Sequence, residues 1–218
     1  MYAPLLEQRG KQAAHVIKQL GHRRMAGSYC ATVQEAKEEV LRLIPDGATV
    51  LRCGSETVVG LGLWDAIAAK PGASILNPYT PGLTPAEALD IRRRGFSADV
   101  LLTSSNALTL DGRLVNLDGA CSRVAPMLFG PSKVVLVVGM NKVVGDLEAA
   151  YARVRTVAAP ANNARLAGPL GLKNPCIEDG RCHNCRSETR ICNAWVVIEG
   201  STVKDRIHVV LVGEDLGY

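Results

Sequence analysis

The sequence predicts an α/β fold, in which a mainly parallel sheet is flanked by helices on both faces. Apolar runs that suit buried strands alternate with amphipathic helical stretches as far as residue 160. Of the 218 residues, 47% are hydrophobic but only 4% are aromatic, so Val, Leu, Ile and Ala must build the core. That composition is typical of parallel strands covered by helices.

The first half of the chain alternates helices with short apolar strands. Apolar residues at helical spacing predict helices over 5–20, 32–44, 58–69 and 84–94. The last of these opens with a reciprocal cap between Thr84 and Glu87, with Pro85 in its first turn. Between them, apolar runs bounded by turn residues predict strands over 25–30, 48–51, 73–76 and 99–103.

The second half contains a hairpin, two more helices and three more strands. Asp111-Gly112 joins two short extended runs over 108–115, which is a strong hairpin signal. Helices are expected over 124–129 and 146–157, and strands over 133–138, 194–199 and 206–212. We divide the chain into an α/β domain, 1–170, and a segment, 171–218. This segment holds a cysteine-rich loop and two extra strands packed on the same domain.

Composition and patterning exclude several classes of protein. The net charge of +4 is mild and the basic residues form no long run, so no nucleic-acid partner is expected. We expect no membrane span, because no stretch approaches the roughly 18 apolar residues that one needs. The first residues lack a secretory h-region, which predicts a cytoplasmic protein. Nicotinamide and P-loop nucleotide sites are disfavoured, because neither glycine motif is present.

Four cysteines near the C-terminus carry the strongest chemical signal. Cys176, Cys182, Cys185 and Cys192 follow the pattern C-x5-C-x2-C-x6-C in a polar stretch that offers little to a core. Disulfides would need an oxidising compartment, so we favour a metal site, either zinc or an iron–sulfur cluster. His183 lies inside the C-x2-C pair and is expected to be a bystander, because four sulfurs complete the ligand shell.

Polar residues follow several of the predicted strands. In parallel sheets, ligands bind beyond the carboxyl ends of the strands. Small hydroxyls, amides and one lysine there predict a pocket for an anionic small molecule, a carboxylate or a phosphate. The alternative for each residue is that it only forms a loop. The candidate substrate-binding residues are Gly54, Ser55, Ser104, Ser105, Asn106, Asn141 and Lys142.

Glu56 is the candidate catalytic residue. It is the only carboxylate directly after the second predicted strand and is a conceivable general base. A carboxylate is also favoured in the first turn of a helix by the helix dipole, and we favour this structural role.

Several long motifs resemble the lactate-utilization (LUD) domain family, and its cysteine-containing single-domain branch in particular. The resemblance covers nearly the whole chain. It rests on residues 103–119, 123–125, 130–131, 138–142 and 159–160, on the cysteine segment 176–193 and on the ending 206–218.

The resemblance implies the α/β fold shared by sugar-phosphate isomerases, coenzyme A transferases and formyltetrahydrofolate cyclo-ligase. Family members take part in lactate oxidation beside iron–sulfur and oxidoreductase partner proteins. This context and the irregular cysteine spacing favour a [4Fe–4S] cluster over zinc, in an accessory or electron-transfer component of lactate or hydroxy-acid utilization. The alternatives are a stand-alone isomerase- or transferase-like enzyme with a structural zinc or cluster site, and a metal or redox sensor. Cys53 and Cys121 depart from the family pattern, so ligand identity is not carried over from relatives.

Overall fold

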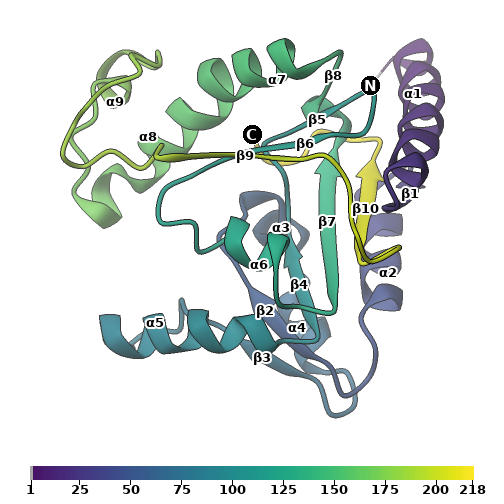
Figure 1. Ribbon diagram of the computed structural model, residues 1–218, viewed down its shortest axis with the longest axis horizontal. Helices are drawn as coiled ribbons and strands as arrows, with labels where there is room; N and C mark the ends of the chain where they lie inside the picture. Colours follow the sequence, from purple (N-terminus) through teal and green to yellow (C-terminus); the bar gives the residue numbers. More distant parts are fainter. Residues whose placement is uncertain (1) are drawn as a thin grey trace.

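Parallel strands form the main sheet, in the order β1-β10-β7-β4-β2-β3 (Figure 1). In the computed structural model, which describes residues 2–218, every neighbouring pair of these six strands is parallel. The α/β prediction is therefore confirmed. In this order, the strands are β1 (Ala26–Cys30), β10 (Ile207–Val212), β7 (Lys133–Gly139), β4 (Val100–Thr103), β2 (Thr49–Arg52) and β3 (Ser74–Leu76).

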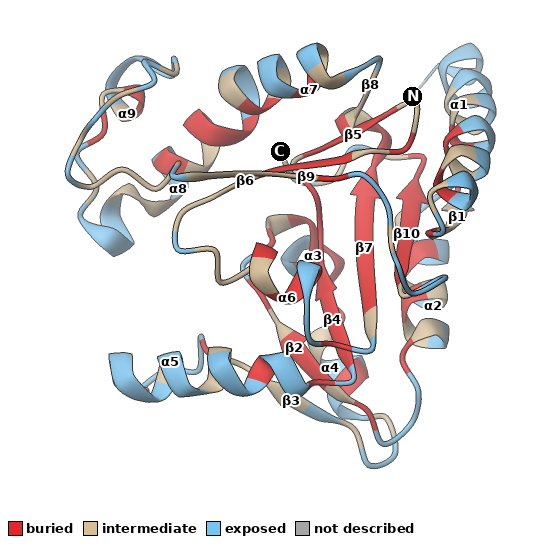
Figure 2. Cartoon of the chain, viewed as in Figure 1, coloured by how far each residue is buried: buried red, intermediate tan, exposed pale blue. Residues whose placement is uncertain are grey.

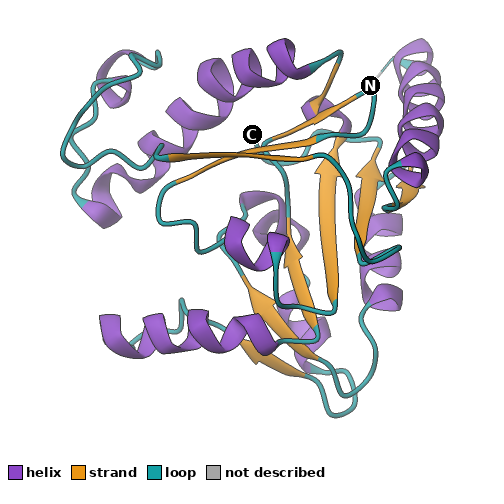
Figure 3. Ribbon diagram, viewed as in Figure 1, coloured by secondary structure: helices purple, strands orange, loops and turns teal. Residues whose placement is uncertain are grey.

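A second sheet packs across one face of the first, in the order β8-β5-β6-β9 (Figure 3). The expected Asp-Gly hairpin supplies β5 and β6, which pair antiparallel. The segment after the cysteine loop supplies β9, which pairs antiparallel with β6. The bounds are Val143–Val144 for β8, Ala107–Thr109 for β5, Leu114–Asp118 for β6 and Ala194–Ile198 for β9.

Helices cover both faces of the main sheet, as the alternation predicts. Thr32 caps α2 by accepting from the backbone N–H of Glu35, and the reciprocal Thr84–Glu87 cap opens α5. The helices are α1 (Ala3–His22), α2 (Val33–Leu43), α3 (Glu56–Leu61), α4 (Trp64–Ala68), α5 (Pro85–Arg94), α6 (Val124–Leu128), α7 (Leu147–Arg153), α8 (Ala159–Leu170) and α9 (Cys176–Asp179). Short 3-10 turns lie at Gly95–Ser97 and Met140–Lys142.

Alternate side chains of each central strand enter different cores. In β7, Leu136 joins a core with α1, α6 and the second sheet, whereas Val135 and Val137 join a core with α2, α3 and α4. These strands are buried along almost their whole length (Figure 2). A third core lies between the second sheet and the α7–α8 region, and includes Val115 and Val154.

Two helix predictions needed correction. The helix expected over 58–69 is two helices, because Gly62 takes a left-handed conformation (φ 62°) and ends α3. The helix expected over 146–157 continues to Leu170 through a π-helical turn, Val154–Ala158. Pro160 lacks the N–H that a regular helix would use at this point, and such prolines commonly accompany changes in helical pitch.

Shortening Leu101 should test the central core. Its side chain on β4 is fully buried, so Leu101→Ala should cost about 2–5 kcal/mol in the free energy of unfolding. Leu89→Ala is the matched control, because Leu89 on α5 is 45% exposed and should cost no more than about 0.5 kcal/mol. Urea unfolding measures both variants. Equal losses would contradict the placement of β4 at the centre of the sheet.

Candidate functional site

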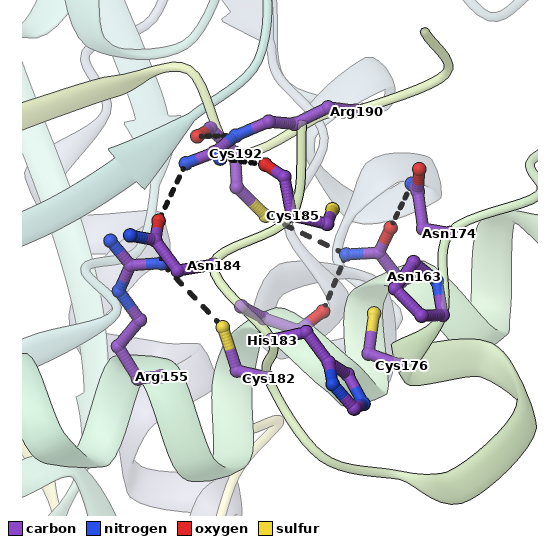
Figure 4. Close-up of a pocket in the computed structure, with 12 residues that line it drawn as sticks. Arg155, Asn163, Asn174, Cys176, Cys182, His183, Asn184, Cys185, Arg190 and Cys192 are labelled. Atoms are coloured by element: carbon purple, nitrogen blue, oxygen red, sulfur yellow. Dashed lines mark hydrogen bonds between the residues drawn. The ribbon is translucent and has the colours of Figure 1, made fainter. Parts of the chain in front are cut away.

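The cysteine loop leaves α8, forms the short helix α9 and returns to the second sheet at β9 (Figure 1). Gly180 ends α9 in a left-handed conformation (φ 74°). Asn184 is also left-handed (φ 46°), a conformation that Asn adopts more readily than most residues. It lies between Cys182 and Cys185, and all three residues line the same cavity (Figure 4).

The four predicted ligands line one cavity, and their sulfur atoms surround a common space (Figure 4). The chain's seven cysteines are all unpaired, so no disulfide holds this loop together. Among residues 2–218, no three His, Cys, Asp or Glu side chains are close enough to form a metal-ion site as they are placed. The structure therefore brings Cys176, Cys182, Cys185 and Cys192 to one cavity without placing three of them as the ligands of a single ion.

Two side chains outside the loop donate hydrogen bonds to the sulfurs. Arg155 Nη1 lies 3.5 Å from Cys182 Sγ, and Asn163 Nδ2 lies 3.6 Å from Cys192 Sγ. Arg155 belongs to the π-helical turn, an element that frequently occurs at functional sites. Both side chains line the cavity (Figure 4).

A buried chain of amides fixes Asn163. Its side chain is 1% exposed and its Oδ1 accepts from Asn174 Nδ2 at 2.6 Å. Asn174 Oδ1 in turn accepts from the hydroxyl of Thr189 at 3.0 Å. With its oxygen occupied, Asn163 must direct its N–H groups toward Cys192 and the carbonyl of Ala159.

Electrostatics around the sulfurs favour a bound cation. Burial, followed by the neighbouring thiols, raises the pKa of Cys176, and burial also raises the pKa of Cys192. Together these effects disfavour several free thiolates in one cavity. Arg190 binds the backbone carbonyls of Cys185 and Cys192 and so places a positive charge beside the loop. Arg181, by contrast, pairs with Asp179 at the surface.

The loop's histidine lines the same cavity without entering the group of sulfurs. His183 lies between Cys182 and Cys185, and its Nε2 lies 3.0 Å from Asp179 Oδ2. This contact turns the imidazole toward α9 (Figure 4).

The residues predicted to line a polar pocket lie at the carboxyl ends of β2, β4 and β7, and several of them surround Lys142. Its ammonium group donates to Thr57 Oγ1 at 2.7 Å and to Ser104 Oγ at 3.2 Å, and the residue is only 3% exposed. Burial, followed by the charges of Arg153 and Arg123, lowers the pKa of Lys142 to about 7. Lys142 and Ser104 are therefore brought together as predicted.

The other pocket candidates hold the surrounding chain in place. Ser55 caps α3, and Ser105 donates to backbone carbonyls of the second sheet. Asn106 Oδ1 accepts from the guanidinium of Arg123 and from the backbone N–H of Leu117. A side chain added at Gly54 would meet the hydroxyl of Tyr79 at 3.0 Å. These positions shape the strand ends, and Lys142 is the one charged residue among the predicted substrate-binding residues.

Glu56 and Asn141 face other partners. The carboxylate of Glu56 pairs with Arg165 at 3.0 Å in the first turn of α3, which is the position that the helix role predicts. Asn141 Oδ1 accepts from the backbone N–H of Leu216, and its Nδ2 donates to the carbonyl of Gly217. Residues 216 and 217 are therefore bound beside the predicted site.

The two remaining cysteines near the strand ends are not exposed nucleophiles. Cys53 is 7% exposed, its thiol lies 3.7 Å from the carbonyl oxygen of Ser122, and burial raises its pKa to about 12. Cys121 is half-buried in a left-handed conformation (φ 60°).

Sequence reasoning missed Arg155, Asn163, Asn174 and Thr57. Arg155 and Asn163 reach the cysteine cavity from the π-helical turn and from α8, and only the tertiary fold brings them there, whereas Asn174 stands two residues before Cys176. Thr57 could have been found, because it stands two residues after Ser55, in the polar run that follows β2.

Replacing Lys142 with Met should remove one pH dependence of stability. The folded chain releases the lysine proton near pH 7, whereas the unfolded chain keeps it up to the ordinary pKa of about 10.5. The unfolded state binds more protons between these values, so the free energy of unfolding should rise by roughly 1 kcal/mol per pH unit. Urea unfolding between about pH 7.5 and 9 should show this rise in the wild type and not in Lys142→Met. Equal slopes would mean that the lysine stays charged in the fold.

Comparisons with known proteins agree with this architecture. None of the helices within residues 2–218 has the length and apolarity to cross a membrane. No curated protein matches the chain. A crystal structure of a DUF162 family protein from Deinococcus radiodurans matches with a TM-score of 0.52 and 14% identity, over 94% of this chain and 98% of that one. This similarity shows the fold. The family model of the LUD domain matches residues 13–212, so the chain belongs to the LUD domain family.

Proposed function

We propose that this LUD-domain protein binds a [4Fe–4S] cluster and acts as an accessory or electron-transfer component in the oxidation of lactate or a related hydroxy acid. The observation that carries the proposal is the common cavity lined by Cys176, Cys182, Cys185 and Cys192, all unpaired. Four thiolates are the usual ligand set of such a cluster.

The spacing of the cysteines along the chain supports a cluster over a single zinc ion. Structural zinc sites usually present two paired knuckles, whereas this loop has one C-x2-C pair flanked by the single residues Cys176 and Cys192.

The surroundings suit a negatively charged redox centre. When bound, a [4Fe–4S] cluster supplies one-electron transfer. Arg155 and Asn163 donate to ligand sulfurs, and Arg190 adds positive charge at the loop. Hydrogen bonds and cations of this kind stabilise the more negative, reduced state of a cluster.

The location of the loop supports an exchange of electrons with partner proteins. It forms an outer edge of the molecule beside α8, and three of its ligands, Cys182, Cys185 and Cys192, are only partly buried. An oxidoreductase could approach the centre there. Unpaired cysteines also suit the reducing cytoplasm, where we place the protein. The proposed small-molecule partner is an anion at Lys142, whose ammonium group donates to two hydroxyl groups.

Anaerobic purification should give a brown protein with about four iron and four sulfide per chain. Cys182→Ser and Cys185→Ser should each lose most of the iron, because each removes one thiolate of the set. Cys121→Ser is the control, since Cys121 lies outside the cavity and should keep full iron content. Iron and sulfide assays with the visible spectrum measure all four proteins.

Two results would contradict the proposal. Colourless protein with one zinc per chain would show that the loop is a structural zinc site. It would favour the alternative that the protein is a stand-alone enzyme. Full iron in both serine variants would show that other residues are the ligands.

Removing the Asn163 amide should lower the reduction potential of the cluster. Asn163→Leu deletes an N–H that stabilises the reduced state, which should shift the potential by roughly 20–60 mV to more negative values. An EPR-monitored redox titration measures the shift. Asn162→Leu is the control on the same helix, because its amide contacts Arg165 and Tyr218 rather than a sulfur. An unchanged potential in Asn163→Leu, with iron retained, would show that the amide only positions the loop.

A further inference from the structure

Positive charge exceeds negative charge in the interior at the carboxyl ends of β4 and β7. Arg123, Lys142 and Arg153 are close enough that the two arginines lower the pKa of the lysine. Arg123 has a carboxylate nearby, with Asp118 Oδ2 3.4 Å from its Nε. Within residues 2–218, neither Lys142 nor Arg153 forms an ion pair. The region therefore lacks an anion.

Such an arrangement is costly if it serves only the fold. An ammonium group loses several kcal/mol of solvation on burial, and two hydroxyl partners offset only part of that loss. Lys142 is 3% exposed, and its partners Thr57 and Ser104 are also buried. Neutral residues of similar volume would fill this space at lower cost, so a buried lysine at this position points to a ligand.

The end of the chain now lies over this lysine. The hydroxyl of Thr57 lies 3.4 Å from the carbonyl oxygen of Leu216, and Asn141 exchanges two hydrogen bonds with Leu216 and Gly217, both at 3.2 Å. A side chain on Gly217 would come within 3.3 Å of Lys142 Nζ. The backbone of 216–217 thus presents two acceptors and one donor beside the buried charge.

The structure assigns to residues 216–218 the role of a removable cover over an anion site formed by Thr57, Ser104, Asn141 and Lys142. Its ligand is a small carboxylate that carries a neighbouring hydroxyl group. The carboxylate oxygens would replace the carbonyl oxygens of Leu216 and Gly217 as acceptors for Thr57 and Asn141. The ligand hydroxyl would replace the backbone N–H of Leu216 as the donor to Asn141 Oδ1. This inference rests on the small-molecule part of the proposed function and is independent of the cluster.

The cover is fastened by groups that can release it. Beyond Gly217, the Tyr218 hydroxyl accepts from Arg165 Nε at 2.7 Å and donates to Asn162 Oδ1 at 3.2 Å. Arg165 is 37% exposed, so water can replace these contacts. Gly217 itself has φ 58° and lies against Thr57, where an added Cβ would come within 2.5 Å of the hydroxyl. Any larger residue at 217 must lift the cover without altering a residue of the site.

Calorimetric titration of the 218-residue chain with glycolate at about pH 6.5, where the lysine is charged, tests the inference. Gly217→Val should bind glycolate at least about 5-fold more tightly than the wild type, because the competing segment is displaced. Tyr218→Phe, a milder change, should tighten binding about 2-fold and serves if Gly217→Val folds poorly. Lys142→Met, checked for folding by circular dichroism, should weaken binding at least about 10-fold. Acetate and inorganic phosphate should bind more weakly than glycolate.

Several outcomes would overturn the inference. Glycolate that binds to none of the proteins, or equally to Lys142→Met, would remove the site. Weaker binding by both Gly217→Val and Tyr218→Phe would show that the segment is part of the site and not its cover. Tighter binding of phosphate than of glycolate would contradict the ligand class. Iron content is measured in every preparation. If iron is present but glycolate does not bind, the anion site is wrong and the proposed cluster is unaffected. If glycolate binds but iron is absent, the proposed cluster is wrong and the anion site is unaffected.

Discussion

The repulsion among four sulfur atoms is the constraint on which the candidate redox site depends. The loop that carries them contributes little to the three hydrophobic cores, so its own packing cannot hold the thiols together. Burial and mutual proximity raise the pKa of Cys176, which makes simultaneous ionisation unfavourable in the absence of a cation. A metal centre would satisfy the sulfurs and order the loop at once, because metal binding and local folding are coupled in such sites.

The rest of the fold supports this loop from both ends. On one side, the π-helical turn and α8 carry Arg155 and Asn163 to the sulfurs. On the other, the backbone N–H of Asn193, next to Cys192, donates to the carbonyl of Asp118 as the chain enters β9. The same helix α8 meets the end of the chain through Asn162 and Arg165. The cysteine cavity and the Lys142 region therefore share one helix, whose successive residues Asn162 and Asn163 face different partners.

Much of the fold could be predicted because its signals are local. Alternating apolar residues in β7 mark a strand buried on both faces, and the Thr84–Glu87 pair marks the start of α5. The grouping of the cysteines was also predictable, since all four lie within one short loop. The second sheet was harder, because β9 pairs with β6 across a long separation in sequence. The helix boundaries near Gly62 and Pro160 were predicted wrongly, since the backbone conformation at each residue depends on tertiary context. No local sequence pattern marks the hydrogen bond from Asn163 to Cys192, because it too depends on the tertiary fold.

Iron K-edge X-ray absorption of the anaerobically purified chain addresses the central claim most directly. The account predicts sulfur scattering in the first shell together with a strong iron–iron contribution, as a multinuclear cluster requires. A spectrum without metal–metal scattering, or a protein whose only metal is zinc with four sulfurs at about 2.3 Å, would contradict it.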